Sequence, residues 1–273
     1  MAIVVVLGAE SQAATSLAVA YPERQFIFVS DRDILDGGDL PNVRAISANG
    51  PDLESVKRSA VRIVALCPRW LQSPDETSLT RTFATLERAL PGMALPLSTA
   101  AEGRTRWVVK GDRWHRPDNP LSGSAEQLAD IVDVHGCGLV FQEHLEVTQT
   151  FMAIGLREGP ARSHIGIVRV FEERYFRDNV LQAAESVDAP DIVSASLQTL
   201  DALDHRGYFT LNWLKTRESL RLSSFRPVPR AIFGMFRRGG VDMLASCQSV
   251  TAVPAGIRII AAPTYVSFKK VGE

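Results

Sequence analysis

Cysteine is scarce in this sequence, with three residues among 273. Cys67, Cys137 and Cys247 are odd in number, lie far apart and show no CxxC spacing, so they predict neither a disulfide framework nor a zinc site, and we expect small core residues. A charge of one sign is also missing, because 30 Lys and Arg residues balance 31 Asp and Glu residues. Without a net field that would attract a polyanion, we expect no nucleic-acid partner.

Long apolar runs are missing as well. No run approaches the roughly 18 residues that a membrane-spanning helix needs. The run from Ala2 to Leu7 has no basic region before it and no small-residue cleavage site, so it does not resemble a secretory signal. We therefore expect a cytoplasmic protein without a membrane partner, and its 45% hydrophobic and 22% charged composition is typical of a globular protein.

Two common enzyme classes find little support. Asp31 follows the second expected strand, where a dinucleotide-binding fold bonds a ribose hydroxyl, but only Gly8 stands where that fingerprint needs three glycines. A nicotinamide-dependent or unrelated α/β enzyme therefore stays a minor alternative. None of the five histidines accompanies a serine or cysteine in a nucleophile-elbow context, which argues against a hydrolytic triad.

The first part of the chain alternates between strands and helices. Ile3 to Leu7 is a continuous apolar run, followed by a glycine and by helical composition from Ala13 to Tyr21. Further strands are expected at 25–30, 44–46 and 61–67, and further helices at 52–58 and 77–90. An apolar first strand that leads into a glycine turn and a helix is typical of a parallel α/β unit.

The middle of the chain places a lysine and an acid at the ends of two expected strands. Arg106 to Gly111 is a short β-branched run with Lys110 near its end, and the stretch at 138–145 contains a second apolar strand that runs into Gln142 and Glu143. A polar loop at 112–123 and a helix at 125–132 are expected between them. Beyond residue 147 the pattern changes to long strands, expected at 151–157, 163–171, 208–214, 220–224, 257–262 and 265–268, with helices at 189–203 and 241–247.

The order strand with lysine, polar loop, helix, strand with Gln-Glu resembles one half of the nucleotide clamp of the ATP-grasp family. The segment around Gly207 to Leu214 resembles the family's "LGYxGxxxxDF" motif, and Arg226-Pro227 matches part of its "lEiNPRp" motif. The resemblance implies an ATP-grasp fold of α/β and α+β pieces, preceded by a small parallel α/β domain. It implies domains at 1–100, 101–146 and 147–273, with Lys110 and Glu143 facing a cleft.

The resemblance also implies an activity. ATP-grasp enzymes generally join a carboxylate to an amine or thiol through an acyl phosphate made from ATP, so the expected partner is a small-molecule substrate. Lys110 would bond the α- and β-phosphates, and Arg113 and His115 in the loop would hold anions. Arg226 and Arg230 would hold the transferring phosphoryl group or the substrate carboxylate. The alternative for each of these side chains is an ordinary solvated position.

An adenine hinge is implied directly after the second of the two middle strands. Gln142, Glu143, His144 and Leu145 would form it, with the purine edge against Glu143 and the backbone of Leu145. Glu146 is the nearest acid that could bond the ribose hydroxyls. A solvated strand end is the alternative for Glu146.

The metal site departs from the family pattern. Mg²⁺ prefers carboxylate ligands, yet Asn212 and the neighbourhood of Ser223-Ser224 stand at the two usual positions. Asn212 could offer one neutral oxygen to an ion held mainly by ATP. Three outcomes stay open: ATP and water hold the metal, other acids replace the usual ones, or the ATP chemistry is lost. The second hypothesis is therefore a degenerate ATP-grasp protein that binds a nucleotide or phosphorylated ligand without turnover, as a homo-oligomer or a partner subunit.

Overall fold

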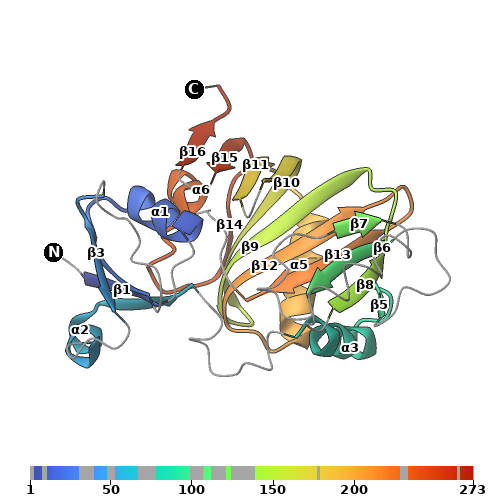
Figure 1. Ribbon diagram of the computed structural model, residues 1–273, viewed down its shortest axis with the longest axis horizontal. Coiled ribbons are helices and arrows are strands. Elements are labelled where there is room, and N and C mark those ends of the chain that lie inside the picture. The colour runs from blue at the N-terminus through green and yellow to red at the C-terminus, as the bar shows by residue number, and fades with distance from the viewer. Residues whose placement is uncertain are drawn as a thin grey trace.

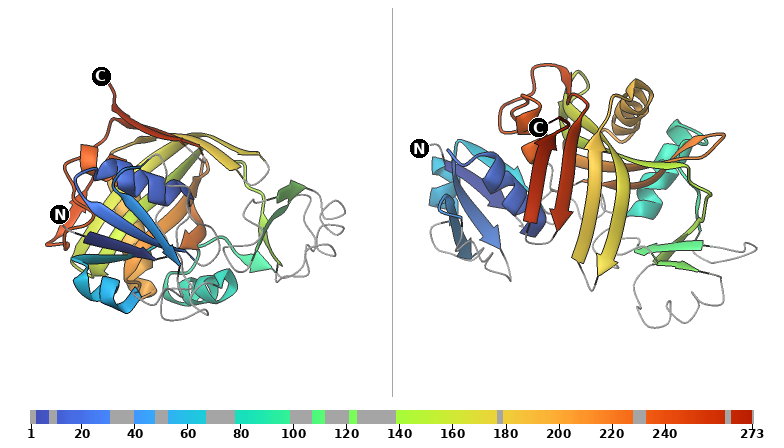
Figure 2. Two further views of the ribbon diagram at one scale, coloured as in Figure 1. Left: turned by 60° about the vertical axis from the view of Figure 1, so that its left-hand side comes forward. Right: turned by 90° about the horizontal axis from the view of Figure 1, so that it is seen from above.

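The computed structural model describes residues 3–7, 11–30, 40–47, 53–66, 78–98, 107–111, 121–123, 139–176, 179–227, 233–262 and 265–272. The described strands form three sheets. In Figure 1 the N-terminal sheet lies at the left, the large sheet in the middle and the small sheet at the right. The right-hand view of Figure 2 keeps this order, with the large sheet between the other two.

The N-terminal sheet is parallel, as the sequence predicts. Its strands are β1 (Ile3–Leu7), β2 (Gln25–Ser30), β3 (Val43–Ser47) and β4 (Arg62–Ala65), in the order β3-β2-β1-β4, with helices α1 (Ser11–Ala20) and α2 (Leu53–Ser59). Alternate residues of β1 enter two different clusters, because successive side chains of a strand point to opposite faces. Val4 and Val6 pack with residues of α1, and Val5 and Leu7 pack with Val56 of α2.

The large sheet holds eight strands, of which all but the short β14 follow one path, β13-β12-β9-β10-β11-β15-β16. They are β9 (Gln149–Gly159), β10 (Arg162–Phe176), β11 (Asn179–Ser186), β12 (Gly207–Lys215), β13 (Leu220–Arg226), β14 (Val250–Ala252), β15 (Ile257–Ala262) and β16 (Tyr265–Lys270). β14 pairs with β10 in parallel, and the neighbours along the path are antiparallel. The predicted change from strand-helix alternation to long strands is therefore confirmed.

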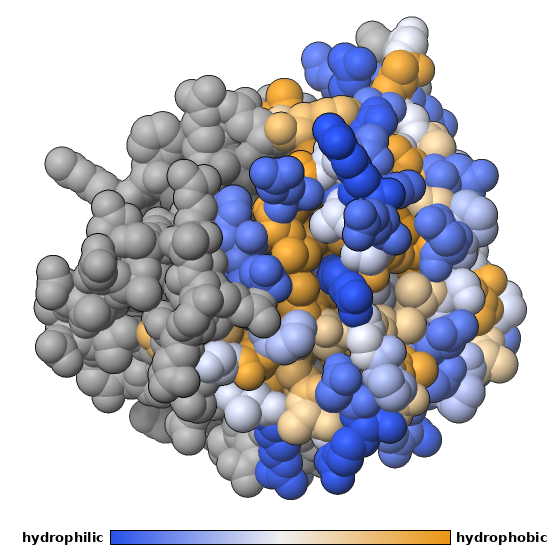
Figure 3. Space-filling model, turned by 90° about the vertical axis from the view of Figure 1, so that its right-hand side faces the viewer, coloured by the Kyte–Doolittle hydropathy of each residue, from blue (hydrophilic) through white to orange (hydrophobic). Residues whose placement is uncertain are grey.

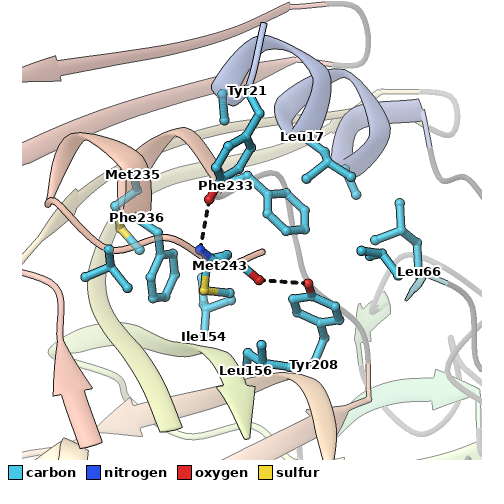
Figure 4. Packing of buried hydrophobic residues seen from close by; sticks show 14 of the residues in the cluster. Leu17, Tyr21, Leu66, Ile154, Leu156, Tyr208, Phe233, Met235, Phe236 and Met243 are labelled. Carbon is cyan, nitrogen blue, oxygen red and sulfur yellow. Dashed lines mark hydrogen bonds between the residues drawn. The ribbon is translucent and has the colours of Figure 1, made fainter. Parts of the chain in front are cut away.

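Helices cover both faces of the large sheet. On one face, α3 (Leu79–Ala89) and α5 (Pro190–Ala202) pack over a cluster that contains Phe151, Phe209 and Trp213. On the other face, α6 (Phe233–Arg238) and α1 pack over Ile154 and Leu156. Figure 4 shows this second cluster, in which Tyr21 accepts a hydrogen bond from the Met243 amide and Tyr208 donates one to the Met243 carbonyl.

An ion pair also joins the N-terminal sheet to the large sheet. Glu158, at the end of β9, accepts one hydrogen bond from the Arg62 guanidinium at 2.9 Å and one from the Cys247 amide at 2.8 Å. Hydrogen bonds from Arg62 and from the Cys247 amide outweigh partial burial and hold the pKa of the Glu158 carboxyl below its ordinary value. Glu158 thus joins β4 of the N-terminal sheet and the segment after α6 to β9 of the large sheet.

The small sheet is antiparallel and contains β5 (Leu97–Ser98), β6 (Trp107–Gly111), β7 (Leu121–Gly123) and β8 (Leu139–Glu143), in the order β5-β8-β6-β7. β6 and β8 are the two middle strands that the sequence predicts. Figure 3 views the molecule from this side, where apolar residues lie between hydrophilic ones on the described surface.

The helix expected at 241–247 is wrong. The Asp242 carboxylate accepts a hydrogen bond from the Leu244 amide, and the Tyr21 hydroxyl accepts one from the Met243 amide. This segment is therefore a turn held by side chains. The helix α6 lies just upstream and ends before Gly240, whose φ of +77° suits glycine. The helix expected at 125–132 lies outside the described residues. Among the described residues, no helix is long and apolar enough to cross a membrane.

Candidate functional site

Four polar side chains share one face of the β12–β13 ladder. The register pairs Thr210 with Arg226 and Asn212 with Ser224, and directly paired residues of an antiparallel ladder point to the same side. β9 places Ile154 beside Thr210 on this face. The polar group therefore continues the face that carries α6 and α1, away from α5.

Two oxygen atoms of this group are buried without a hydrogen-bond partner among the described residues. They are Asn212 Oδ1 and Ser224 Oγ, and Ser224 as a whole is only 6% exposed. Leaving a buried polar atom unpaired costs about 1 to 3 kcal/mol, so such atoms are uncommon in a folded protein. The two oxygens are suited to accept a hydrogen bond from a ligand or water, or to coordinate a cation.

A β-bulge fixes the backbone at this point. The register between β12 and β13 shifts after Asn212, and Ser223 donates a hydrogen bond from its hydroxyl to the Asn212 carbonyl at 3.3 Å. Bulges change the direction of side chains and are frequent beside functional sites. Here the bulge places Ser224, rather than Ser223, opposite Asn212.

This face does not fit a magnesium ion held by the protein. Its two unpaired oxygens are neutral, whereas Mg²⁺ is usually bound through carboxylates. Among the described residues, no group of three or more His, Cys, Asp or Glu side chains is arranged to hold a metal. The predicted metal ligand Asn212 offers one neutral oxygen, and its role stays a prediction.

The predicted hinge residues lie at the end of β8. Glu143, His144 and Glu146 are exposed and Leu145 is half-buried. Gln142 differs from them, because it is 1% exposed and donates a hydrogen bond from Nε2 to the Leu95 carbonyl at 3.5 Å. The Gln142 side chain thus bonds to another part of the protein, and the purine contacts of the hinge stay a prediction.

The cationic residues of the predicted site are only partly described. The backbone of Lys110 lies in β6 opposite Val140, and nothing is described of its side chain. Arg226 is half-buried at the end of β13. Arg113, His115 and Arg230 lie outside the described residues. The structure therefore brings Asn212 and Arg226 onto one face and places the hinge residues on a second sheet.

Sequence reasoning missed the segment that connects these two regions. Leu95 donates its amide hydrogen to the Leu222 carbonyl, and Leu222 donates its own to the Met93 carbonyl, both at 2.9 Å. Leu97 of β5 then pairs with Gln142 of β8. Only a two-residue strand forms here, and a strand that short leaves no periodic signal in the sequence.

The clearest pKa shifts lie away from this site. Burial lowers the pKa of His205 to about 4 and raises the pKa of the Cys247 thiol to about 11. His205 packs edge-on against Phe225, and Cys247 is buried beside β9. Both groups are therefore held neutral inside the protein near neutral pH.

No family model matches the sequence, and no curated protein matches it. Solved structures do match. An N5-carboxyaminoimidazole synthetase from Staphylococcus aureus in complex with ADP aligns at 9% identity with a TM-score of 0.66, over 95% of this chain and 81% of that one. An L-amino acid ligase from Bacillus licheniformis aligns at 12% identity with a TM-score of 0.60, over 89% of this chain and 72% of the ligase. A biotin carboxylase from Campylobacter jejuni, in complex with β-γ-ATP, aligns at 12% identity with a TM-score of 0.59, over 88% of this chain and 69% of the carboxylase.

The chain has the ATP-grasp fold. The predicted architecture, a parallel α/β domain followed by mixed α+β parts, is confirmed with it. At these identities the likeness establishes the fold, and the chemistry has to be argued from the residues of this chain.

Proposed function

We propose that this ATP-grasp protein binds ATP between the end of β8 and the polar face of β12–β13, and that it uses ATP for a ligase reaction. One observation carries the proposal: on the same face as Arg226, Asn212 Oδ1 and Ser224 Oγ are buried and have no hydrogen-bond partner in the described part of the chain. Structural neighbours crystallised with ADP and with an ATP compound support a nucleotide as the ligand. Hinge residues 143–146 would then meet the purine and ribose.

The proposed reaction joins a small carboxylate to an amine or a thiol. A carboxylate oxygen attacks the γ-phosphorus of ATP, the bond from that phosphorus to ADP breaks, and ADP leaves with the electron pair. The amine or thiol then attacks the carbonyl carbon of the acyl phosphate, inorganic phosphate leaves, and the nucleophile loses a proton to solvent. This chemistry depends on positioning and charge neutralisation, for which Arg226 and Lys110 are the proposed cations.

The neutral oxygens set a condition on metal use. Because Asn212 and Ser224 add no negative charge, they offer Mg²⁺ far less Coulomb stabilisation than two carboxylates would. We propose that any Mg²⁺ arrives with the triphosphate and is held mainly by it. No role in the reaction is assigned to a metal bound by the protein alone.

The same neutral pair favours a second candidate function, which is nucleotide binding without turnover. Such a protein would use Arg226 and the hinge to hold a nucleotide or a phosphorylated ligand, within a homo-oligomer or beside a partner subunit. The difference from the first candidate is chemical, because only the ligase releases ADP and phosphate.

A two-step experiment tests the proposal. First, the melting temperature is measured with ATP, ADP and GTP, each with and without Mg²⁺; a bound nucleotide at 100 times its Kd should add about 2.7 kcal/mol of stability. Second, ADP release is measured with mixtures of small carboxylates and amines. Stabilisation with ADP release supports the ligase, stabilisation without release supports the binding protein, and no stabilisation by any nucleotide contradicts both.

A further inference from the structure

The segment from Met93 to Ser98, called the strap here, is fixed at both ends by backbone hydrogen bonds to neighbouring strands. Its first half joins β13 through two backbone hydrogen bonds with Leu222 and an isolated parallel bridge from Ala94. Its second half is β5, which pairs with β8. The strap therefore links the edge strand of the large sheet to a strand of the small sheet.

The entry into the strap is also well fixed. Gly92, with φ of +74°, turns the chain after α3, and its amide donates to the Glu87 carboxylate at 3.3 Å. Ala94 and Leu95 are 3% and 4% exposed, so this part of the strap is buried, whereas Pro96 is exposed. Thr199 of α5 donates a hydrogen bond to the Met93 sulfur. Burial with paired backbone groups makes this part of the chain resistant to local opening.

The two ends of the strap meet residues that directly neighbour the proposed site. On β13 the strap bonds Leu222, two positions before Ser224. On β8 it contacts Gln142, which directly precedes Glu143. The buried side-chain amide of Gln142 donates a hydrogen bond to the Leu95 carbonyl. One short segment thus connects the hinge strand to β13, the strand that carries Ser224.

We infer that the strap sets the separation between the hinge and the polar face of β12–β13, with Gln142 as its positioning residue. This inference rests on the proposed nucleotide site. A nucleoside triphosphate has a fixed span between its base and its γ-phosphate, so a protein that binds both ends must hold its two contact regions at a matching distance. Holding them in place before the ligand arrives reduces the ordering that binding requires.

The test uses Gln142→Met, which keeps the length of the side chain and removes its hydrogen bond. Gln198→Met is the matched control, because Gln198 is exposed and its amide bonds Ser194 of the same helix. ATP reaches both regions, whereas AMP reaches the hinge and falls short of the γ-phosphate position. We expect Gln142→Met to weaken ATP binding about tenfold, the upper range for one lost hydrogen bond, and to leave AMP binding nearly unchanged.

The ratio of the two affinities separates positioning from other roles. An equal loss for ATP and AMP would mean that Gln142 contacts the purine or only supports the fold, and would overturn the inference. No loss for either ligand would overturn it as well. Gln198→Met should change neither affinity.

Hydrogen exchange tests the strap without any nucleotide. The Leu222 amide, which bonds the Met93 carbonyl, should exchange faster in Gln142→Met than in Gln198→Met, and equal rates would contradict the inference. If no nucleotide binds the wild type, the proposed function fails while this measurement still decides on the strap.

Exchange in the wild type covers the case in which Gln142→Met does not fold. The Leu95 and Leu222 amides should open as one unit and exchange with the same free energy. The Val253 amide, which bonds the Ile165 carbonyl outside the strap, is the reference. Leu95 and Leu222 amides that open with clearly different free energies would overturn the inference.

Discussion

The two faces of the β12–β13 ladder differ in the hydrogen bonding of their buried polar atoms. On the face covered by α5, the Trp213 indole donates a hydrogen bond to the Ser196 hydroxyl at 2.9 Å. On the opposite face, Asn212 Oδ1 and Ser224 Oγ have no partner among the described residues. On the covered face of the ladder the Trp213 indole is paired and the apolar side chains are packed. The polar face keeps buried acceptors, without a partner among the described residues, at the place where we propose that a ligand binds, so the comparison separates stability from function.

The largest expected effect is on the covered face. Trp213→Ala removes a side chain that is 1% exposed, leaves a cavity and removes the hydrogen-bond donor of the Ser196 hydroxyl. We expect the free energy of unfolding to fall by about 3 to 5 kcal/mol. Urea unfolding measures this loss; a loss below about 1 kcal/mol would mean that the covered face is not the core described here.

Lowering the pH should destabilise the fold through His205, which packs on the covered face. The folded protein holds this imidazole neutral with a pKa of about 4, whereas the unfolded chain takes up the proton near the ordinary value of 6.5. The unfolded state thus binds more protons between these values, so stability falls as the pH falls from about 6.5 to about 4, by about 3 kcal/mol at most. The control is His205→Gln, which does not titrate; a wild-type pH profile parallel to that of His205→Gln would contradict this.

A substitution of Lys110, in β6 of the small sheet, tests whether a bound triphosphate lies between this sheet and the polar face of β12–β13. Lys110→Ala should weaken ATP binding by about 1 to 3 kcal/mol, the range for a lost charged hydrogen bond in a cleft. Its effect on AMP should be smaller, because the proposed contact is to phosphates. Calorimetric titration measures both affinities, and ATP affinity equal to that of the wild type would remove Lys110 from the site.

Two buried serines give the sharpest matched comparison. Ser196 is bonded to Trp213, and the Ser224 hydroxyl has no hydrogen-bond partner within the described ranges, although both residues are almost fully buried. Ser196→Ala should destabilise the fold by about 1 to 3 kcal/mol, since it leaves the indole N–H unpaired. Ser224→Ala should be neutral or slightly stabilising and should weaken ATP binding. If Ser224→Ala unfolds as easily as Ser196→Ala, the distinction between the two faces fails.

The sequence predicts most strands of this fold because their apolar and β-branched runs are local signals. Ile3 to Leu7 and Gln25 to Ser30 match β1 and β2 residue for residue. The helix expected at 241–247 fails for the opposite reason: the contact from Tyr21 to the Met243 amide joins residues 222 positions apart, and no local pattern reports it. β11 is missed because its charged and small residues show no clear alternation.

The site was predictable only where a motif stands in the sequence. Asn212 and Arg226 come from the resemblance to the family, and the ladder brings them onto one face. The unpaired state of Ser224, the burial of Gln142 and the strap depend on strand register and on contacts between distant segments. Such features follow from the tertiary fold and cannot be read from composition or periodicity.

The central claim is that the polar face of β12–β13 binds a nucleotide with neutral oxygens and not with a protein-held metal. Calorimetry of the wild-type protein tests it most directly, with Mg²⁺ titrated into the nucleotide-free protein and ATP titrated in the presence of Mg²⁺. The account predicts no measurable Mg²⁺ binding in the first titration, ATP binding in the second, and tighter Mg²⁺ binding once Asn212→Asp supplies a carboxylate. Tight Mg²⁺ binding to the nucleotide-free wild type, or no ATP binding, would contradict it.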